Sequence, residues 1–172
     1  MSDLKRFARL RFFSGRLLTA ADFSLEQNYF RGKLKLHNRA LHGFGIVSGL
    51  NVTVQSGKVV VTAGLALDCE GNELVVATDE SLAGPPASWQ TAYVNLHYVE
   101  QESNDGVLAN QATIIQESSE LKCDQQNFNS KHRHLRGRWL ACGTCHPLTI
   151  ARLRPRGGGW RVDRRYRPPT VK

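Results

Sequence analysis

Four cysteines and one histidine carry the clearest potential for chemistry in this chain. Cys142 and Cys145 form a Cys-x-x-Cys pair that His146 follows directly, and Cys69 and Cys123 lie upstream. A Cys-x-x-Cys pair lets two thiolates reach one tetrahedral metal ion from a tight turn. We therefore predict a candidate structural zinc site made of Cys123, Cys142, Cys145 and His146.

Two other interpretations of these cysteines stay open. The second Cys pair at metal-ligand spacing is absent, and His132 or His134 can take the place of His146 as a ligand. The thiols can instead be structural, either reduced or joined in a disulfide. A catalytic dithiol is disfavoured, because Pro147 and a β-like segment follow where a redox pair starts a helix. Cys69 alternates with strand residues and is expected to be a buried thiol.

Arginines interleaved with aromatic residues dominate the C-terminal part of the chain. This pattern is typical of phosphate contact combined with base stacking. No helix-turn-helix, zinc-finger array, RRM or KH pattern accompanies it, so docking on an acidic protein is favoured and a basic nucleic-acid-binding module, which zinc can stabilise, is the alternative. The arginines predicted to contact a partner are Arg152, Arg154, Arg161, Arg164, Arg165 and Arg167.

No group of residues in the sequence predicts catalysis. The serines lack the Gly-x-Ser-x-Gly nucleophile elbow, and no glycine-rich run resembles a phosphate-binding loop. The acidic pair Asp68 and Glu70 lies at a turn, where solvation or pairing with arginine explains it. We therefore predict that the protein is not an enzyme.

Charge is distributed in three blocks along the 172 residues, which carry a net charge of +8. Residues 1–39 hold nine Lys or Arg against three acids, residues 40–130 hold two against eleven, and residues 131–172 hold twelve against one. Opposite fields steer association, so the blocks predict pairing within the chain or with a neighbouring molecule. A merely solvated surface is the other interpretation.

A helix with a marked start is predicted from about Ala20 to about Leu41. Thr19 is a good N-cap with Asp22 three residues later, which approximates a capping box, and Gly43 and Gly45 lie just past the end. Two apolar stripes run along the helix, so either a second polypeptide covers it or it is sunk deeply in its own domain. One stripe has alternating spacings of four and three residues: Phe23, Gln27, Phe30, Leu34, His37 and Leu41. We predict that Phe23, Phe30, Leu34 and Leu41 bind a partner.

Past the helix, the hydrophobic period changes to two, and turn signals recur about every ten residues. The fold class predicted is α+β and mainly β, with the helix packed on an antiparallel β sandwich or barrel-like sheet. The predicted organisation is a basic aromatic arm (1–18), one α+β domain (19–155) with a polar loop at about 124–138, and an arginine-rich hairpin and tail (156–172). No apolar run approaches the ~20 residues that span a bilayer.

Three segments resemble a family associated with the baseplates of phage-tail-like contractile injection systems. They are FFSGRLLTAADFSLEQNYF (12–30), HNRALHGFGIVSGLNV (37–52) and VVVTAGLALDCEGNELVV (59–76). The resemblance implies an accessory baseplate, spike or fibre-associated protein. The expected role is a structural, multi-copy component that docks on other baseplate, spike or fibre proteins, with synthesis and assembly in the cytoplasm and a final place in a particle that is released or membrane-anchored.

Overall fold

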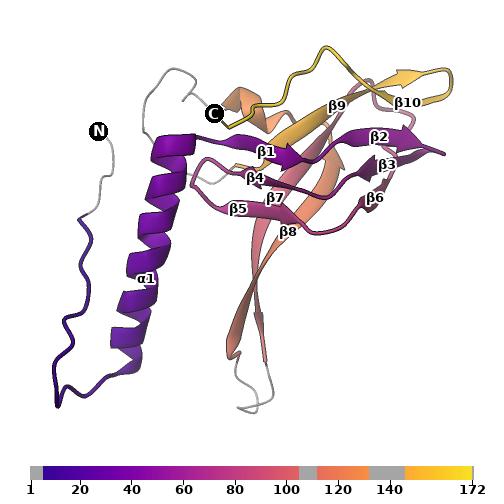
Figure 1. The fold of residues 1–172 in the computed structure, drawn as a ribbon. Helices are drawn as coiled ribbons and strands as arrows, with labels where there is room; N and C mark the ends of the chain where they lie inside the picture. The colour runs from indigo at the N-terminus through magenta and orange to yellow at the C-terminus, as the bar shows by residue number, and fades with distance from the viewer. Residues whose placement is uncertain (1–5, 105–111, 132–145, 172) are drawn as a thin grey trace.

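The computed structural model describes residues 6–104, 112–131 and 146–171. A curled β sandwich forms the body of the molecule, and one long helix stands beside it (Figure 1). The N-terminal segment runs along the side of the helix that faces away from the sandwich (Figure 1). The predicted fold class, α+β and mainly β, is confirmed.

The helix begins and ends where the sequence indicates. At the start of α1 (Ala20–His37), the Thr19 hydroxyl accepts a hydrogen bond from the Asp22 amide (3.3 Å) and the Asp22 carboxylate accepts one from the Thr19 amide (3.0 Å). The capping box therefore satisfies two amides that have no partner inside the helix. A π-helical turn, η1 (Asn38–His42), extends the helix until Gly43 leaves it with φ of +77°.

Three long strands, each broken by a bend, make one wall of the sandwich. On the side of the bend nearer α1, the halves form a sheet in the order β1 (Gly45–Gly49), β4 (Gly64–Leu67), β5 (Glu73–Val76) (Figure 1). On the other side of the bend, the halves form a sheet in the order β2 (Val52–Gln55), β3 (Lys58–Val61), β6 (Glu80–Ala83). At the bend, a Cβ on Gly49 would overlap the Ala63 carbonyl oxygen, so this crossing requires glycine.

A four-stranded antiparallel sheet makes the other wall. Its order is β10 (Gly159–Val162), β9 (Leu148–Arg156), β7 (Ala92–Ser103), β8 (Ile114–Asp124). The 3₁₀ turn η2 (Phe128–Lys131) lies in the described part of the predicted polar loop. The predicted final hairpin across residues 156–159 forms, and both of its strands belong to this sheet. After it, Thr170 forms a parallel bridge with Ile46 of β1.

The hydrophobic core lies between the two walls. Leu50, Val59, Leu74, Val94, Leu96 and Leu153 are among its fully buried side chains. A buried polar pair lies within the four-stranded sheet, where Asn95 of β7 is directly opposite Thr149 of β9. The Thr149 hydroxyl donates to the Asn95 side chain (2.6 Å) and accepts from the Phe128 amide (2.9 Å). Cys69 is buried, as predicted. None of the residues of α1 is buried, which excludes a helix sunk deeply in its own domain.

Candidate docking surfaces

The N-terminal arm covers one face of α1. The Phe7 ring meets the Tyr29 ring edge-on, with centroids 6.2 Å apart. A Cβ on Gly32 would lie only 2.8 Å from the Phe7 ring, so the glycine lets the ring lie against the helix. The Lys33 ammonium lies over both rings, 5.7 and 5.9 Å from their centroids. The second apolar stripe of the sequence is thus partly covered by the chain itself. Its residues are Leu25, Tyr29, Gly32, Leu36 and Ala40.

A turn of the sandwich holds the C-terminal end of the helix. The buried Asn38 amide group donates to the Gly71 carbonyl (3.1 Å). The buried Asp68 carboxylate fixes that turn by accepting from the Glu70 and Asn72 amides, both at 2.8 Å. Gly71 has φ of +88°, and a Cβ there would overlap the Lys35 carbonyl oxygen. Turn and helix are therefore in van der Waals contact, which we call the Asn38–Gly71 latch.

A second attachment joins the middle of the helix to strand β7. Arg31 forms an ion pair with Glu100 (2.5 Å), and the Tyr98 hydroxyl donates to the same carboxylate (2.8 Å). The hydrogen bond from Tyr98 is the main cause that lowers the pKa of Glu100, and burial opposes it. Because Arg31 and Glu100 are 41% and 36% exposed, this pair adds only about 0–1 kcal/mol. The Asn38–Gly71 latch is thus the firmer of the two attachments.

The stripe with four-and-three spacing is open to solvent along its whole length. Phe23, Phe30, Leu34 and Leu41 are 58%, 61%, 52% and 64% exposed, and Gln27 and His37 are exposed between them. We call these six residues the heptad stripe. Apolar residues at this spacing form the contact line of helices that pack as a coiled coil. The structure places all four predicted helix contacts on one uncovered line.

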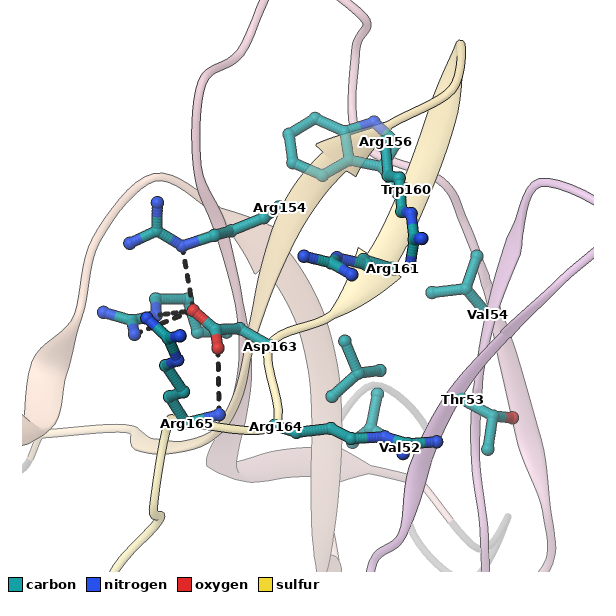
Figure 2. Close-up of a pocket in the computed structure, with 12 residues that line it drawn as sticks. Val52, Thr53, Val54, Arg154, Arg156, Trp160, Arg161, Asp163, Arg164 and Arg165 are labelled. Carbon is teal, nitrogen blue, oxygen red and sulfur yellow. Dashed lines mark hydrogen bonds and ion pairs between the residues drawn. The ribbon is translucent and has the colours of Figure 1, made fainter.

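Five of the six predicted arginines line one groove (Figure 2). The groove lies on the side of the sandwich away from α1 (Figure 1). This arginine groove has a volume of about 980 Å³ and lies between strand β2 and the β9–β10 hairpin. Figure 2 shows Val52, Thr53 and Val54 on one wall, with Arg154, Asp163 and Arg165 across from them. The lining residues that carry charge are Arg152, Arg154, Arg156, Arg161, Asp163, Arg164 and Arg165. Arg167 lies outside the groove and donates to the Arg164 carbonyl.

Asp163 organises part of the groove. Its carboxylate accepts from the Arg165 amide (2.9 Å) and forms ion pairs with Arg152 and Arg154, both at 2.8 Å. The amide hydrogen bond is the main cause that lowers the pKa of Asp163, and the two guanidinium groups lower it further. Arg152 also lies over the Tyr166 ring, 5.6 Å from its centroid. Two of the arginines are therefore held in place, and the single carboxylate balances one of their two charges.

The remaining groove arginines have no counter-charge in the described part of the chain. No ion pair among residues 6–104, 112–131 and 146–171 joins Arg156, Arg161, Arg164 or Arg165 to a carboxylate. The net positive charge of the lining, six arginines against one aspartate, is therefore available to an acidic partner.

The predicted zinc site falls largely outside the described residues, where Cys142 and Cys145 lie. Cys123 is on β8, half-buried, and burial raises the pKa of its thiol to about 11. His146 precedes β9. Among the residues that the structure describes, no group of three His, Cys, Asp or Glu side chains can hold a metal ion. The zinc site stays a prediction.

Several residues that shape these surfaces were not predicted from the sequence. The latch joins positions 33 residues apart, and β2 reaches the groove from a hundred residues upstream of β10. Asp163 could have been singled out from the sequence, because it is the single acidic residue of the basic C-terminal block, residues 131–172. In the described part of the chain, no helix combines the length and apolar character needed to cross a bilayer.

Three solved structures that share this fold are TssK and chains of two type VI secretion baseplate complexes. No protein-family model matches this chain, and no curated protein matches it in sequence. A crystal structure of TssK is similar, with a TM-score of 0.58 and 15% identity over 96% of this chain and 42% of that one. A chain of the TssK-TssF-TssG baseplate subcomplex of the type VI secretion system has a TM-score of 0.57 and 13% identity. This match covers 96% of this chain and 62% of that one. A chain of another type VI secretion baseplate complex has a TM-score of 0.55 and 14% identity, and the match covers 96% of this chain and 60% of that one.

The likeness extends over nearly the whole of this chain, but only over part of the other proteins. The chain spans 42% to 62% of the length of the chains that it matches. At 13% to 15% identity, what is shared is the fold. That fold is one that baseplate components of a contractile injection machine use, as the sequence resemblance implied.

Proposed function

We propose that this chain is a structural subunit of a contractile injection system, placed in its baseplate or spike region. The observation that carries the proposal is the match of 96% of the chain to TssK-type baseplate proteins. The contractile-system resemblance of residues 12–76 supports the same assignment from sequence. In this proposal, the protein acts by holding neighbouring subunits together and carries out no chemical reaction.

The heptad stripe is the first docking surface of the proposal, and its partner is the same helix of a second copy. Six positions follow the repeat over nearly three heptads, which is the pattern of a helix that packs on a like helix. Gln27 and His37 interrupt the apolar line. Polar residues at such positions fix register and copy number at some cost in stability, which suits an assembly of defined size.

The arginine groove is the second docking surface of the proposal. It lies on the side of the sandwich away from α1, so both surfaces can be occupied at once (Figure 1). A subunit with two separate contact regions can connect like copies through one and unlike proteins through the other.

The placement can be tested on intact particles. Contractile particles purified from the source organism, with this chain carrying an epitope tag, should bind gold-labelled antibody at the baseplate end of the sheath. Label that is spread along the sheath, or particles that lack the chain altogether, would contradict the proposal. A tagged sheath protein serves as the control for antibody access.

The helix contact can be tested on the purified chain. Phe30→Glu should convert an oligomer at about 100 µM into a monomer in sedimentation experiments, because it buries a charge in the contact line. Asn28→Glu adds the same charge at an exposed position outside the stripe and should leave the oligomer intact. A wild-type chain that stays monomeric at this concentration would rule out self-association through the stripe.

A further inference from the structure

Two strands that have a partner on only one side, among the described residues, border the arginine groove. β2 is an edge of its three-stranded sheet, and β10 is an edge of the four-stranded sheet. Their closest Cα atoms lie within 8 Å, yet no ladder joins the two strands. Hydrogen-bonded strands lie about 4.8 Å apart, so the two sheets meet without pairing at this place.

The register shows which backbone groups face the groove. Both strands belong to hairpins with two-residue loops, and in antiparallel pairs every second residue turns its N–H and C=O away from the partner strand. The Thr62 amide donates to the Asn51 carbonyl (3.0 Å), and the Asp163 amide donates to the Arg152 carbonyl (2.8 Å). These bonds mark residues 51 and 163 as inward-facing members of their ladders.

Counting by two from these positions identifies the outward-facing residues. They are Val52 and Val54 on β2, and Trp160 and Val162 on β10. Pro155, which has no N–H, pairs with Trp160, as expected for a non-hydrogen-bonded position. No hydrogen bond within the described residues uses the backbone groups of these four. The groove therefore offers free donors and acceptors along both walls.

The side chains of the groove divide into a charged and an apolar set. Arg154 and Arg161 are directly opposite each other in the β9–β10 ladder and are exposed. Val52, Val54 and Val162 are half-buried and pack against the core. In a strand added beside β10, every second side chain would lie near the exposed arginines, and the side chains between them would lie near the valines.

We propose that the groove binds an extended acidic segment of a neighbouring subunit, which adds as a strand along the edge of β10. Because a strand between β10 and β2 needs about 9.6 Å between the two, the β9–β10 hairpin moves away from β2 when the segment binds. The segment would carry Asp or Glu at every second position, facing Arg154 and Arg161, and apolar residues between them, facing the valines. Backbone hydrogen bonds would supply affinity, and the alternation would supply selectivity. This inference rests on the proposed function, because it names the kind of subunit surface that the groove accepts.

Two other uses of the groove are disfavoured by the structure. A nucleic acid needs an open aromatic face for stacking, but Trp160 packs on the core and its indole N–H donates to the Pro85 carbonyl (2.8 Å). Arginines can also guard a strand edge against unwanted pairing. A guard needs no apolar wall, however, whereas Val52, Val54 and Val162 line this groove.

Binding of labelled peptides to the full chain tests the proposal. An octapeptide in which Glu and Val alternate, called the alternating peptide, should bind. A block peptide of the same composition, with all of its glutamates before all of its valines, should bind at least about tenfold more weakly. Two further versions of the alternating peptide carry N-methyl groups on every second residue, in one set of positions or the other. Because an added strand uses every second N–H, one version should lose about tenfold in affinity and the other should keep nearly all of it.

A pair of charge-reversal variants locates the site. Arg161→Glu should weaken binding of the alternating peptide at least about tenfold, and Arg9→Glu, which makes the same change of charge in the N-terminal arm, should change it by less than about threefold. Circular dichroism checks that both variants are folded.

Several results would overturn the proposal. Equal binding of the two N-methylated peptides would mean that charge alone is recognised. Tighter binding of an octathymidine DNA would identify the groove as a polyanion site, and no binding at about 1 mM would identify the arginines as an edge guard. A chain found at the baseplate that fails these tests refutes only this inference, and a chain that passes them but is absent from particles refutes only the proposed function.

Discussion

The β sandwich buries its large apolar side chains, whereas the helix α1 exposes several of its own. In the sandwich, large residues such as Leu74 and Leu153 are completely removed from water. In the helix, the equally large Phe30 and Leu34 are more than half exposed. Burial of a Leu or Phe side chain stabilises a fold by about 1.5–3 kcal/mol, so nearly all hydrophobic stabilisation of the described chain resides in the sandwich.

This difference separates what makes the protein fold from what makes it associate. The buried core of the described chain lies in the sandwich. The helix α1 is attached to it by the Asn38–Gly71 latch, by the exposed ion pairs of Arg31 with Glu100 and Glu117, and by Lys35, which lies over the Tyr98 ring. Exposed contiguous apolar residues on a soluble chain usually mark a contact with another molecule. Substitutions in the two regions should therefore affect different measurements.

The largest effect is expected when a matched leucine substitution is made in each region. Leu153→Ala should lower the free energy of unfolding by about 3 kcal/mol, because it opens a cavity in the core. Leu34→Ala should lower it by less than about 0.5 kcal/mol in the monomeric chain. Urea unfolding at low protein concentration measures both. Similar losses for the two variants would show that the helix is covered within the single chain.

A substitution at the latch comes next. Gly71→Ala should destabilise the attachment of the helix by about 2 kcal/mol, since it combines an unfavourable positive φ with an overlap at the Lys35 carbonyl. Gly43→Ala has a similar φ but open space around the Cβ, so it should cost only about 1 kcal/mol. Hydrogen exchange of the amides in η1 reports the difference. Equal exchange in the two variants would contradict the latch.

Removal of the helix cap should have a smaller and more local effect. Thr19→Ala should destabilise the first turn of α1 by about 1 kcal/mol, because the Thr19 hydroxyl no longer accepts from the Asp22 amide or donates to the Asp22 carboxylate. Faster hydrogen exchange should be confined to residues 20–24, with the urea midpoint of the sandwich unchanged. Ser24→Ala, within the same turns but outside the cap, is the control and should not speed exchange.

The smallest expected effect is a dependence on pH within the sandwich. Burial is the main cause that lowers the pKa of His97, whose ring lies 6.1 Å from the Phe128 ring. The unfolded chain therefore binds a proton more readily, and stability should fall as pH decreases below about 6.5. His97→Gln should reduce the shift of the urea midpoint between pH 7.5 and 5.5, whereas His37→Gln, at an exposed helix position, should not.

Local features were predicted well from the sequence because they depend on neighbouring residues. The cap at Thr19 and the end of the helix before Gly43 both form as the sequence indicates. The alternating pattern also gave the correct fold class. Each of these follows from backbone preferences or from the period of apolar residues.

Features that depend on the meeting of distant segments could not be predicted in the same way. Two apolar stripes on α1 do not reveal that Phe7 covers one and leaves the other open. Glycines 49 and 64 indicate a turn or a bend, but only the packed strands show that three strands bend together. The arginines indicated a docking surface. The opposite wall of the groove comes from β2, and no residue of the C-terminal block indicates that β2 lies there.

The latch at the end of α1 also gives the helix a mechanical character. A helix of 18 residues is about 27 Å long, so a rotation of about 5° at Asn38 would move its first turn by about 2.4 Å. Small adjustments of the turn around Gly71 are thus magnified at the opposite end, as in a lever with its pivot on the sandwich. In the proposed assembly, such a movement would let the helix adapt to the spacing of neighbouring copies without a change in the sandwich.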